Sequence, residues 1–498
     1  MSAMREDIPP CRGETASLSD AELLSDSELD ARFTRVLGDV FSGASAGSSA
    51  CSNIPGTLKP GPVLILPPDT TRIHSRAGLL TAAVCRELGA AGGRIPRHWS
   101  LGAIMPAPGT HRPLTVEEIG LMFPGCPGDR FLPHRWRNDT LELGRLEADW
   151  VEAAFTAFTG TFGKTDPGAF SGKASAFPEP AAFHLDWPVQ VNRLLRDGLP
   201  GRGPFSLIIS IGQVTPHEIA GMSNHGKNIF VGTGGAEAIH KSHWLGALYG
   251  LERLMGVTEN PVRSLFDEAL RRYESLLPPI LWILTVVDYR NRVRGLFCGF
   301  GRECFTEAAA LAAELNIERI TPPAGEMAAA DPPGVKKMVV WLGEEFRSTW
   351  LGNKAVYRTR RAMACGGELL VLAPHVECFG EDPALDALVR RHGYRGTAAI
   401  RRAAAEDPEL ADNLSAAAHL IHGSGEGRFT IRYCGPGTTE GFGRRDIEQT
   451  GYEWGNLEEA ITRYVPEGPD SQNQGWNTTA DGEGYYFIRN PALGLWIA

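Results

Sequence analysis

Histidine and lysine side chains gather in one stretch of the chain, between residues 214 and 243. This stretch holds His217, Lys227 and His243, which are ten and sixteen residues apart. Imidazoles exchange protons and bind metal ions near neutral pH, and a lysine amine can carry a covalently attached group. The apolar run 205–211 that precedes the stretch is typical of a buried strand. Reactive groups directly after a strand predict a functional site.

Two loops earlier in the chain carry further polar groups. Residues 69–72 (Asp-Thr-Thr-Arg) follow the apolar segment 63–66, which is a predicted strand, and precede a predicted helix. A second predicted strand, 101–105, leads to residues 109–115, which include His111. An arginine at the tip of such a loop suits a carboxylate, because its planar guanidinium donates two parallel hydrogen bonds.

These segments together resemble the lactate racemase family, whose members are nickel-pincer-dependent racemases and epimerases of hydroxyacids. The pattern H-x-x-A-G-x-S-x-x-x-K runs from His217 to Lys227. The family motifs D-x-T-R and G-x-H-R-P-x-T match at residues 69–72 and 109–115. Any one match is weak, since a single loop histidine is usually structural. The matches occur on separate loops in the family order, which makes a chance likeness much rarer.

The resemblance implies roles for the matched residues. His111 and His217 would be the two proton-transfer residues, and Arg72 would bind the substrate carboxylate. Asp69 would support the cofactor site. Lys227 would carry a covalently attached nickel-pincer nucleotide, which is a pyridinium thioamide/thiocarboxylate mononucleotide.

Further positions complete the implied site. His243 would be the remaining ligand of the nickel ion. Lys354, which lies twelve residues before Gly366, matches a family lysine that helps to hold substrate. Leu351 stands where the family has glutamine, and it would pack against the substrate. The backbone N–H groups of Gly234 and Gly235 could hold the nucleotide phosphate at a helix start. His225 and His240 match no family position, and we expect them to be structural.

The resemblance implies an isomerase that inverts C2 of a 2-hydroxycarboxylate by hydride transfer to and from the cofactor. Two imidazoles suit this reaction, because each face of the flat 2-keto acid needs its own acid or base. Leu351 in place of glutamine indicates a substrate other than lactate. A sugar acid such as an aldonate and a larger or branched hydroxyacid both remain open.

The sequence is also compatible with two other functions. One is a zinc hydrolase in which His217, His240 and His243 hold the metal and leave a position for water. The other is a non-catalytic family member that binds a carboxylate ligand. For the favoured enzyme, the partners would be the small substrate and, transiently, the enzymes that make the cofactor.

Composition bounds the class of protein. The 498 residues are 43% hydrophobic and 22% charged, as in ordinary globular enzymes. The net charge of −10 argues against a nucleic-acid partner. The sequence contains no apolar run of 18 residues and no signal peptide, so we expect a cytoplasmic protein without a membrane partner. Nine cysteines without a C-x-x-C pair indicate reduced thiols.

The pattern of strands and helices predicts an α/β fold with two α/β domains and the active site in the cleft between them. Residues 1–58 would be a polar tail, a short helix near 20–33 and a Gly/Ser linker at 42–49. Residues 59–320 would form the catalytic, cofactor-tethering domain, with an insertion at about 125–204. A proline-rich segment, 321–334, would lead into a smaller C-terminal domain, 321–498, which contributes Lys354.

Overall fold

The chain alternates helices with mainly parallel strands, which confirms the predicted α/β class. The computed structural model describes residues 23–42, 58–89, 93–159, 185–321, 323, 334–436, 442–492 and 494–498. The predicted polar tail, residues 1 to about 18, the first residues of the predicted helix and all but the first residue of the predicted linker lie outside these residues. Among the helices of the described ranges, none combines the length and the apolar character that crossing a bilayer requires.

Five strands form a first sheet in the order β2-β1-β5-β8-β9. They are β1 (Pro62–Leu66), β2 (Ser100–Ile104), β5 (Leu207–Gln213), β8 (Ile280–Val287) and β9 (Val293–Gly299). The first four are parallel to one another, and β9 pairs antiparallel with β8. Strands β5 and β8 are buried along their whole length, because helices cover both faces of the sheet.

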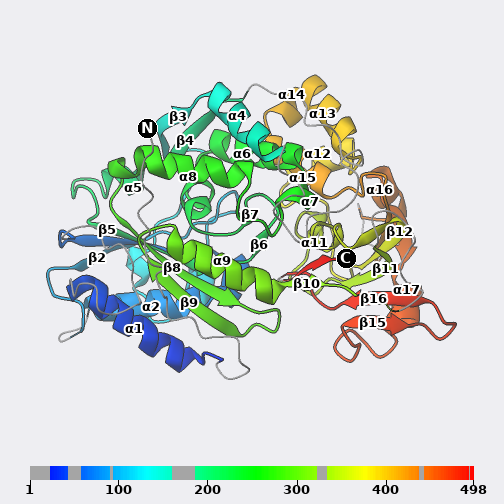
Figure 1. The fold of residues 1–498 in the computed structure, drawn as a ribbon, viewed down its shortest axis with the longest axis horizontal. Helices are drawn as coiled ribbons and strands as arrows, with labels where there is room; N and C mark the ends of the chain where they lie inside the picture. The colour runs from blue at the N-terminus through cyan, green and yellow to red at the C-terminus, as the bar shows by residue number, and fades with distance from the viewer. Residues whose placement is uncertain are drawn as a thin grey trace, which may run out of the picture.

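Six strands form a second sheet in the order β14-β13-β12-β11-β16-β15. They are β11 (Val335–Trp341), β12 (Met363–Leu372), β13 (Thr430–Gly435), β14 (Glu453–Asn456), β15 (Gly475–Thr478) and β16 (Gly484–Ile488). All pairs are parallel except that of β15 with β16. The C-terminal part of the chain therefore has the α/β character that the sequence pattern predicts. Figure 1 shows the second sheet on the right, opposite the first.

Helices cover the faces of both sheets (Figure 1). Those of the first half are α1 (Asp26–Ser42), α2 (Ala77–Gly89), α3 (Val116–Met122), α4 (Ala148–Thr159), α5 (Arg193–Asp197), α6 (Ala236–Tyr249), α7 (Leu251–Leu254), α8 (Pro261–Tyr273) and α9 (Glu303–Asn316). Those of the second half are α10 (Thr349–Gly352), α11 (Lys354–Thr359), α12 (Pro383–His392), α13 (Thr397–Glu406), α14 (Pro408–Ala411), α15 (Leu414–His422), α16 (Arg444–Gln449) and α17 (Leu457–Tyr464). Helices α1 and α2 pack on one face of the first sheet, and α6, α8 and α9 pack on the other.

The predicted N-terminal helix is longer and later than the sequence pattern indicated. Helix α1 begins at Asp26, after Ser25, whose hydroxyl and backbone N–H both hydrogen-bond to Glu28. It continues to Ser42, because buried side chains recur at helical spacing from Leu29 to Phe41. The expected end near residue 33 was therefore wrong, and Ser42 belongs to the helix.

The expected insertion contains ordered structure. Strands β3 (Thr140–Leu146) and β4 (Trp187–Asn192) pair antiparallel, and β4 lies against α6. Near the other end of the chain, β17 (Leu495–Ile497) pairs with β10 (Ile317–Arg319), so the last residues return to the junction between the two sheets (Figure 1). The division into two domains near residue 321 stays a prediction.

A buried ion cluster joins the two halves of the molecule. Glu252 of α7 accepts hydrogen bonds from Arg360, at 3.0 Å, and from Arg428, at 3.1 Å. These side chains are at most 8% exposed. Burial by itself would raise the pKa of Glu252, but the two arginines lower it to about 2. The carboxylate is therefore charged at neutral pH.

We expect Glu252→Gln to lower the free energy of unfolding by about 3–5 kcal/mol, because it leaves two buried guanidinium groups without a counter-charge. Urea denaturation measures the change. Glu448→Gln is the control, since Glu448 pairs with Arg444 on the exposed surface and should leave stability nearly unchanged. Equal effects of the two substitutions would contradict a structural role of the cluster.

Candidate active site

Eight of the ten predicted site residues line one cavity of about 180 Å³ between the two sheets. They are Asp69, Arg72, His111, His217, Lys227, His243, Leu351 and Lys354. The loops after β1, β2 and β5 bring five of them to the carboxyl ends of parallel strands, where such sheets commonly bind ligands. Helix α6 contributes His243, and α10 and α11 of the second half contribute the last two.

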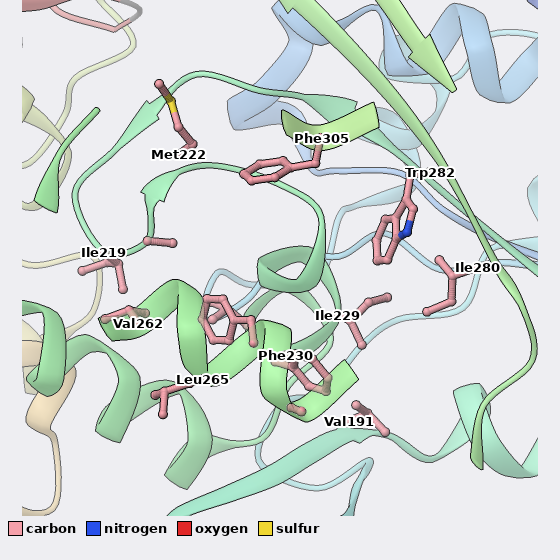
Figure 2. Close-up of a cluster of buried hydrophobic side chains, with 14 of the residues drawn as sticks. Val191, Ile219, Met222, Ile229, Phe230, Val262, Leu265, Ile280, Trp282 and Phe305 are labelled. Carbon is pink, nitrogen blue, oxygen red and sulfur yellow. The ribbon is translucent and has the colours of Figure 1, made fainter. Parts of the chain in front are cut away.

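The segment that carries Lys227 is fixed by the apolar core around it. Figure 2 shows Ile219, Met222, Ile229 and Phe230 among buried side chains of the first half. A buried guanidinium, that of Arg263, donates hydrogen bonds to the carbonyl groups of residues 222 and 224. One turn of π-helix, Asn228–Gly232, follows the lysine. Such turns are frequent at functional sites.

His111 and Asp69 form a carboxylate–imidazole pair. The Nδ1 atom of His111 lies 2.6 Å from Oδ2 of Asp69. Burial alone would raise the pKa of Asp69, but His111, Thr71 and Arg72 lower it to about 2. A carboxylate only accepts hydrogen bonds, so Nδ1 must carry the proton. The lone pair of Nε2 is then free to accept a proton from a ligand in the cavity.

His217 is held differently. Its Nδ1 atom accepts the backbone N–H of Ile219 at 3.1 Å, so the proton of the neutral ring lies on Nε2. Burial lowers the pKa of His217 well below its usual value. The carboxylate of Glu218 lies 3.8 Å from Nδ1 and opposes this shift. The two imidazoles are therefore held in opposite ways: Nδ1 of His111 donates to a carboxylate, and Nδ1 of His217 accepts a backbone N–H.

Cationic side chains outnumber carboxylates around the cavity. Arg72, Lys227 and Lys354 line it, together with the carboxylates of Asp69 and Glu218. Burial, followed by the charge of Arg72, lowers the pKa of both lysines to about 8. The excess of positive charge favours a small anion such as a carboxylate. The lowered pKa leaves a large fraction of each amine neutral, and hence nucleophilic, near pH 8.

His243 has one ring nitrogen that could bind a metal ion. Its Nδ1 atom donates to the carbonyl oxygen of Ile239 at 2.7 Å, which leaves Nε2 as a free ligand atom. Burial lowers the pKa of His243 to about 3, so the ring is neutral, as a ligand must be. No three His, Cys, Asp or Glu side chains of the described ranges are grouped to hold a metal. A metal ion at His243 would need other ligands, such as those of a bound cofactor.

The remaining two predicted residues do not line this cavity. A Cβ atom at Gly234 would lie 1.9 Å from the carbonyl oxygen of Phe230, and one at Gly235 would lie 2.4 Å from Oε1 of Gln190. Close packing therefore explains both glycines. Their binding of a phosphate stays a prediction, and Gly234→Val is no clean test of it, because this substitution would disturb the fold.

The other histidines of the stretch have structural surroundings. His225 packs between Trp282 and Phe305, with ring centroids at 4.4 and 5.2 Å, and lies outside the cavity. His240 hydrogen-bonds to Ser415 at 2.9 Å. The zinc hydrolase hypothesis requires His240 beside His217 and His243, and the described residues offer no such cluster.

Sequence reasoning missed part of the cavity wall. Glu218, Gln213 and three aromatic or imidazole groups of the second half also line it. The latter are Tyr357, His419 and His422. The position of Glu218 beside His217 was a usable signal. The residues of α15 could not be found, because only the tertiary fold brings them to the first sheet.

The low pKa of Lys227 can be tested by amine labelling. At pH 8 about half of a lysine with a pKa of about 8 is neutral, against under about 1% of an ordinary lysine. We expect the rate of carbamylation of Lys227 by cyanate, followed by peptide mass spectrometry, to level off above about pH 9. The exposed Lys59 serves as the reference in the same digest. A rate at Lys227 that keeps rising to pH 10.5 would contradict the lowered pKa.

Comparison with known proteins bears on the fold. No family model matches the chain, and no curated protein sequence matches it significantly. A crystal structure of a structural genomics target from Thermotoga maritima is 20% identical, with a TM-score of 0.68, over 96% of this chain and 99% of that one. The lactate racemase apoprotein from Thermoanaerobacterium thermosaccharolyticum is 14% identical, with a TM-score of 0.59, over 99% of this chain and 97% of that one. The chain thus has the fold of a lactate racemase apoprotein along nearly its whole length.

Proposed function

We propose that this protein is a racemase or epimerase that inverts C2 of a 2-hydroxycarboxylate, with a nickel-pincer nucleotide attached to Lys227. One observation carries the proposal. His111, His217, Lys227 and His243 lie on separate elements of the chain and line the same cavity. The fold shared with the lactate racemase apoprotein supports it.

The cationic groups bind and orient the substrate. Arg72 and Lys354 come from the two halves of the molecule and offer donors to the C1 carboxylate. Anchoring this end leaves C2 near the imidazoles, so that the reacting carbon is positioned before any bond breaks. Leu351, Trp350 and Ile219 line the same cavity and exclude water from part of it.

The two imidazoles of His111 and His217 act on the proton of the C2 hydroxyl group. Nε2 of His111 accepts the C2 hydroxyl proton, and Asp69 stabilises the imidazolium that results. Nε2–H of His217 donates a hydrogen bond to the C2 oxygen, and the proton that His111 took returns to this oxygen when the hydroxyl group forms again. When bound, the nickel-pincer nucleotide supplies the acceptor and donor of the C2 hydride. Lys227 would hold this group covalently, and Nε2 of His243 would hold its nickel ion.

A non-catalytic carboxylate-binding protein is the alternative of another class. The cationic lining would serve such a protein equally well. The pair of His111 with Asp69 favours the enzyme, because a carrier has no use for a proton acceptor with a carboxylate behind it.

The attachment of the cofactor can be tested by mass spectrometry. Protein from cells that supply the cofactor-biosynthesis enzymes should carry a nucleotide-sized adduct, which peptide mapping places on Lys227. Lys227→Ala should lack the adduct. Lys354→Ala is the matched control, because both lysines line the cavity and have a pKa of about 8, and it should keep the adduct. An unmodified Lys227 in fully supplied cells would refute the proposal.

The reaction can be tested with substrate deuterated at C2. We expect the loaded enzyme to invert C2 and to retain most of the deuterium in the product, because hydride transfer does not release this atom to water. Asp69→Asn should lower kcat by about 100-fold or more, since the amide no longer stabilises a charged His111. Proton NMR measures both outcomes. Complete exchange with solvent would indicate deprotonation instead, and no turnover of any hydroxyacid by adduct-bearing enzyme would favour the carrier.

A further inference from the structure

Two buried polar atoms in the cavity wall have no hydrogen-bond partner among the described residues. They are Oε1 of Gln213 and Nε2 of His422. Gln213 is 4% exposed and His422 is 1% exposed, and both line the cavity. Neither is needed for the steps proposed above, which use Arg72 and Lys354 for C1 and the other imidazoles for C2.

An unpaired buried polar atom destabilises the protein, so such an atom in the wall of a binding cavity is expected to pair with a ligand. Gln213 ends strand β5 of the first half, and His422 ends helix α15 of the second. The two atoms therefore reach the cavity from different halves of the molecule. A ligand that pairs with both must carry polar groups in more than one place.

His422 differs from its neighbour His419 in having a ring nitrogen without a partner among the described residues. His419 also lines the cavity, but its two ring nitrogens are taken by Tyr357 and Tyr394. His422 packs edge-on against the ring of Tyr357, and its Nε2 is left over. Burial, followed by the charge of Arg360, lowers the pKa of His422 to about 4. It is therefore a neutral ring, which suits an uncharged hydroxyl group better than a second anion.

A larger cavity of about 580 Å³ adjoins the first. The two share Thr71, His111, Trp350, Leu351 and Ser415 in their walls, among others. The outer cavity gives room for a chain that extends beyond the reacting carbon.

The outer wall is rich in neutral hydrogen-bonding groups. They include Thr70, Thr110, Asn138 and Asn413. Each acidic residue of this wall already has a partner. Asp69 pairs with His111 and Glu118 with Arg112, whereas Glu381 accepts a hydrogen bond from Ser348 and Asp382 caps helix α12. Asn138 belongs to the segment expected as an insertion, which thus contributes to this wall.

We propose that the substrate is a polyhydroxylated 2-hydroxy acid of the aldonate class, and that Gln213 and His422 hydrogen-bond to its hydroxyl groups beyond C2. This inference rests on the proposed function and narrows it. Leu351, which stands where the lactate racemase family has glutamine, then contacts the carbon chain of the substrate. Gln213 and His422 supply the polar contacts from other parts of the cavity wall.

The test uses cofactor-loaded enzyme with lactate and with a series of aldonates of four to six carbons. We expect kcat/KM for the best aldonate to exceed that for lactate by about 10-fold or more, since lactate leaves both buried atoms unpaired. His422→Phe keeps the ring and removes the nitrogen. It should lower kcat/KM about 10-fold for the aldonate and less than about 2-fold for lactate. Gln213→Leu should do the same, and His422→Gln should restore part of the loss.

The matched control is His225→Phe. His225 is also buried, with an unpartnered Nδ1, but it packs on Trp282 and Phe305 outside the cavity. It should change neither the preference for aldonates nor the loading of Lys227.

Each contrary outcome is distinguishable. Turnover of lactate that equals or exceeds that of every aldonate would overturn this inference and leave the racemase standing. Loss of the Lys227 adduct in His422→Phe or Gln213→Leu would show that these atoms serve the cofactor, which also overturns it. Adduct-bearing enzyme that turns over no acid at all would defeat the proposed function itself. Unequal effects of His422→Phe on the two substrates, with intact loading, would support the assignment.

Discussion

The burial of charged and ionisable groups around one cavity is the constraint on which the site depends. Desolvation disfavours each charge, so it lowers the pKa of Lys227 to about 8, where a part of the amine is neutral, and it keeps the ring of His243 neutral. Asp69 and Glu218 stay ionised because neighbouring cationic and imidazole groups outweigh the same effect. A cavity that was open to water would lose these shifts, since water would screen every one of the interactions.

The fold meets this constraint with two separate sheets. Parallel strands bring the ends of β1, β2 and β5 to one edge, so that residues far apart in sequence share one place. The second half closes this edge with α10, α11 and α15. The cluster of Glu252 with Arg360 and Arg428 and the pairing of β10 with β17 fix the two halves together. Reactive groups at the cavity therefore hold their positions without being part of either core.

The paired histidines illustrate how identical side chains gain different properties. His111 has a carboxylate behind it and an accepting Nε2, whereas His217 has a backbone N–H behind it and a donating Nε2. The difference arises from the atoms within hydrogen-bond reach of Nδ1, which the spacing of the histidines does not reveal. The same reasoning separates His422 from His419, which differ only in the partners that the fold gives them.

The sequence by itself determined the α/β class and the strands before each reactive loop, because apolar runs act over short spans. The eight residues that line the cavity came from the motifs that resemble the lactate racemase family. It did not place Gln213, Glu218 or His422 in the wall, and it assigned Gly234 and Gly235 to a phosphate although close packing explains them. Only the tertiary structure decided which side chains share the cavity and which atoms stay unpaired. These properties depend on segments that lie as far apart in the chain as Asp69 and His422, which local sequence patterns do not encode.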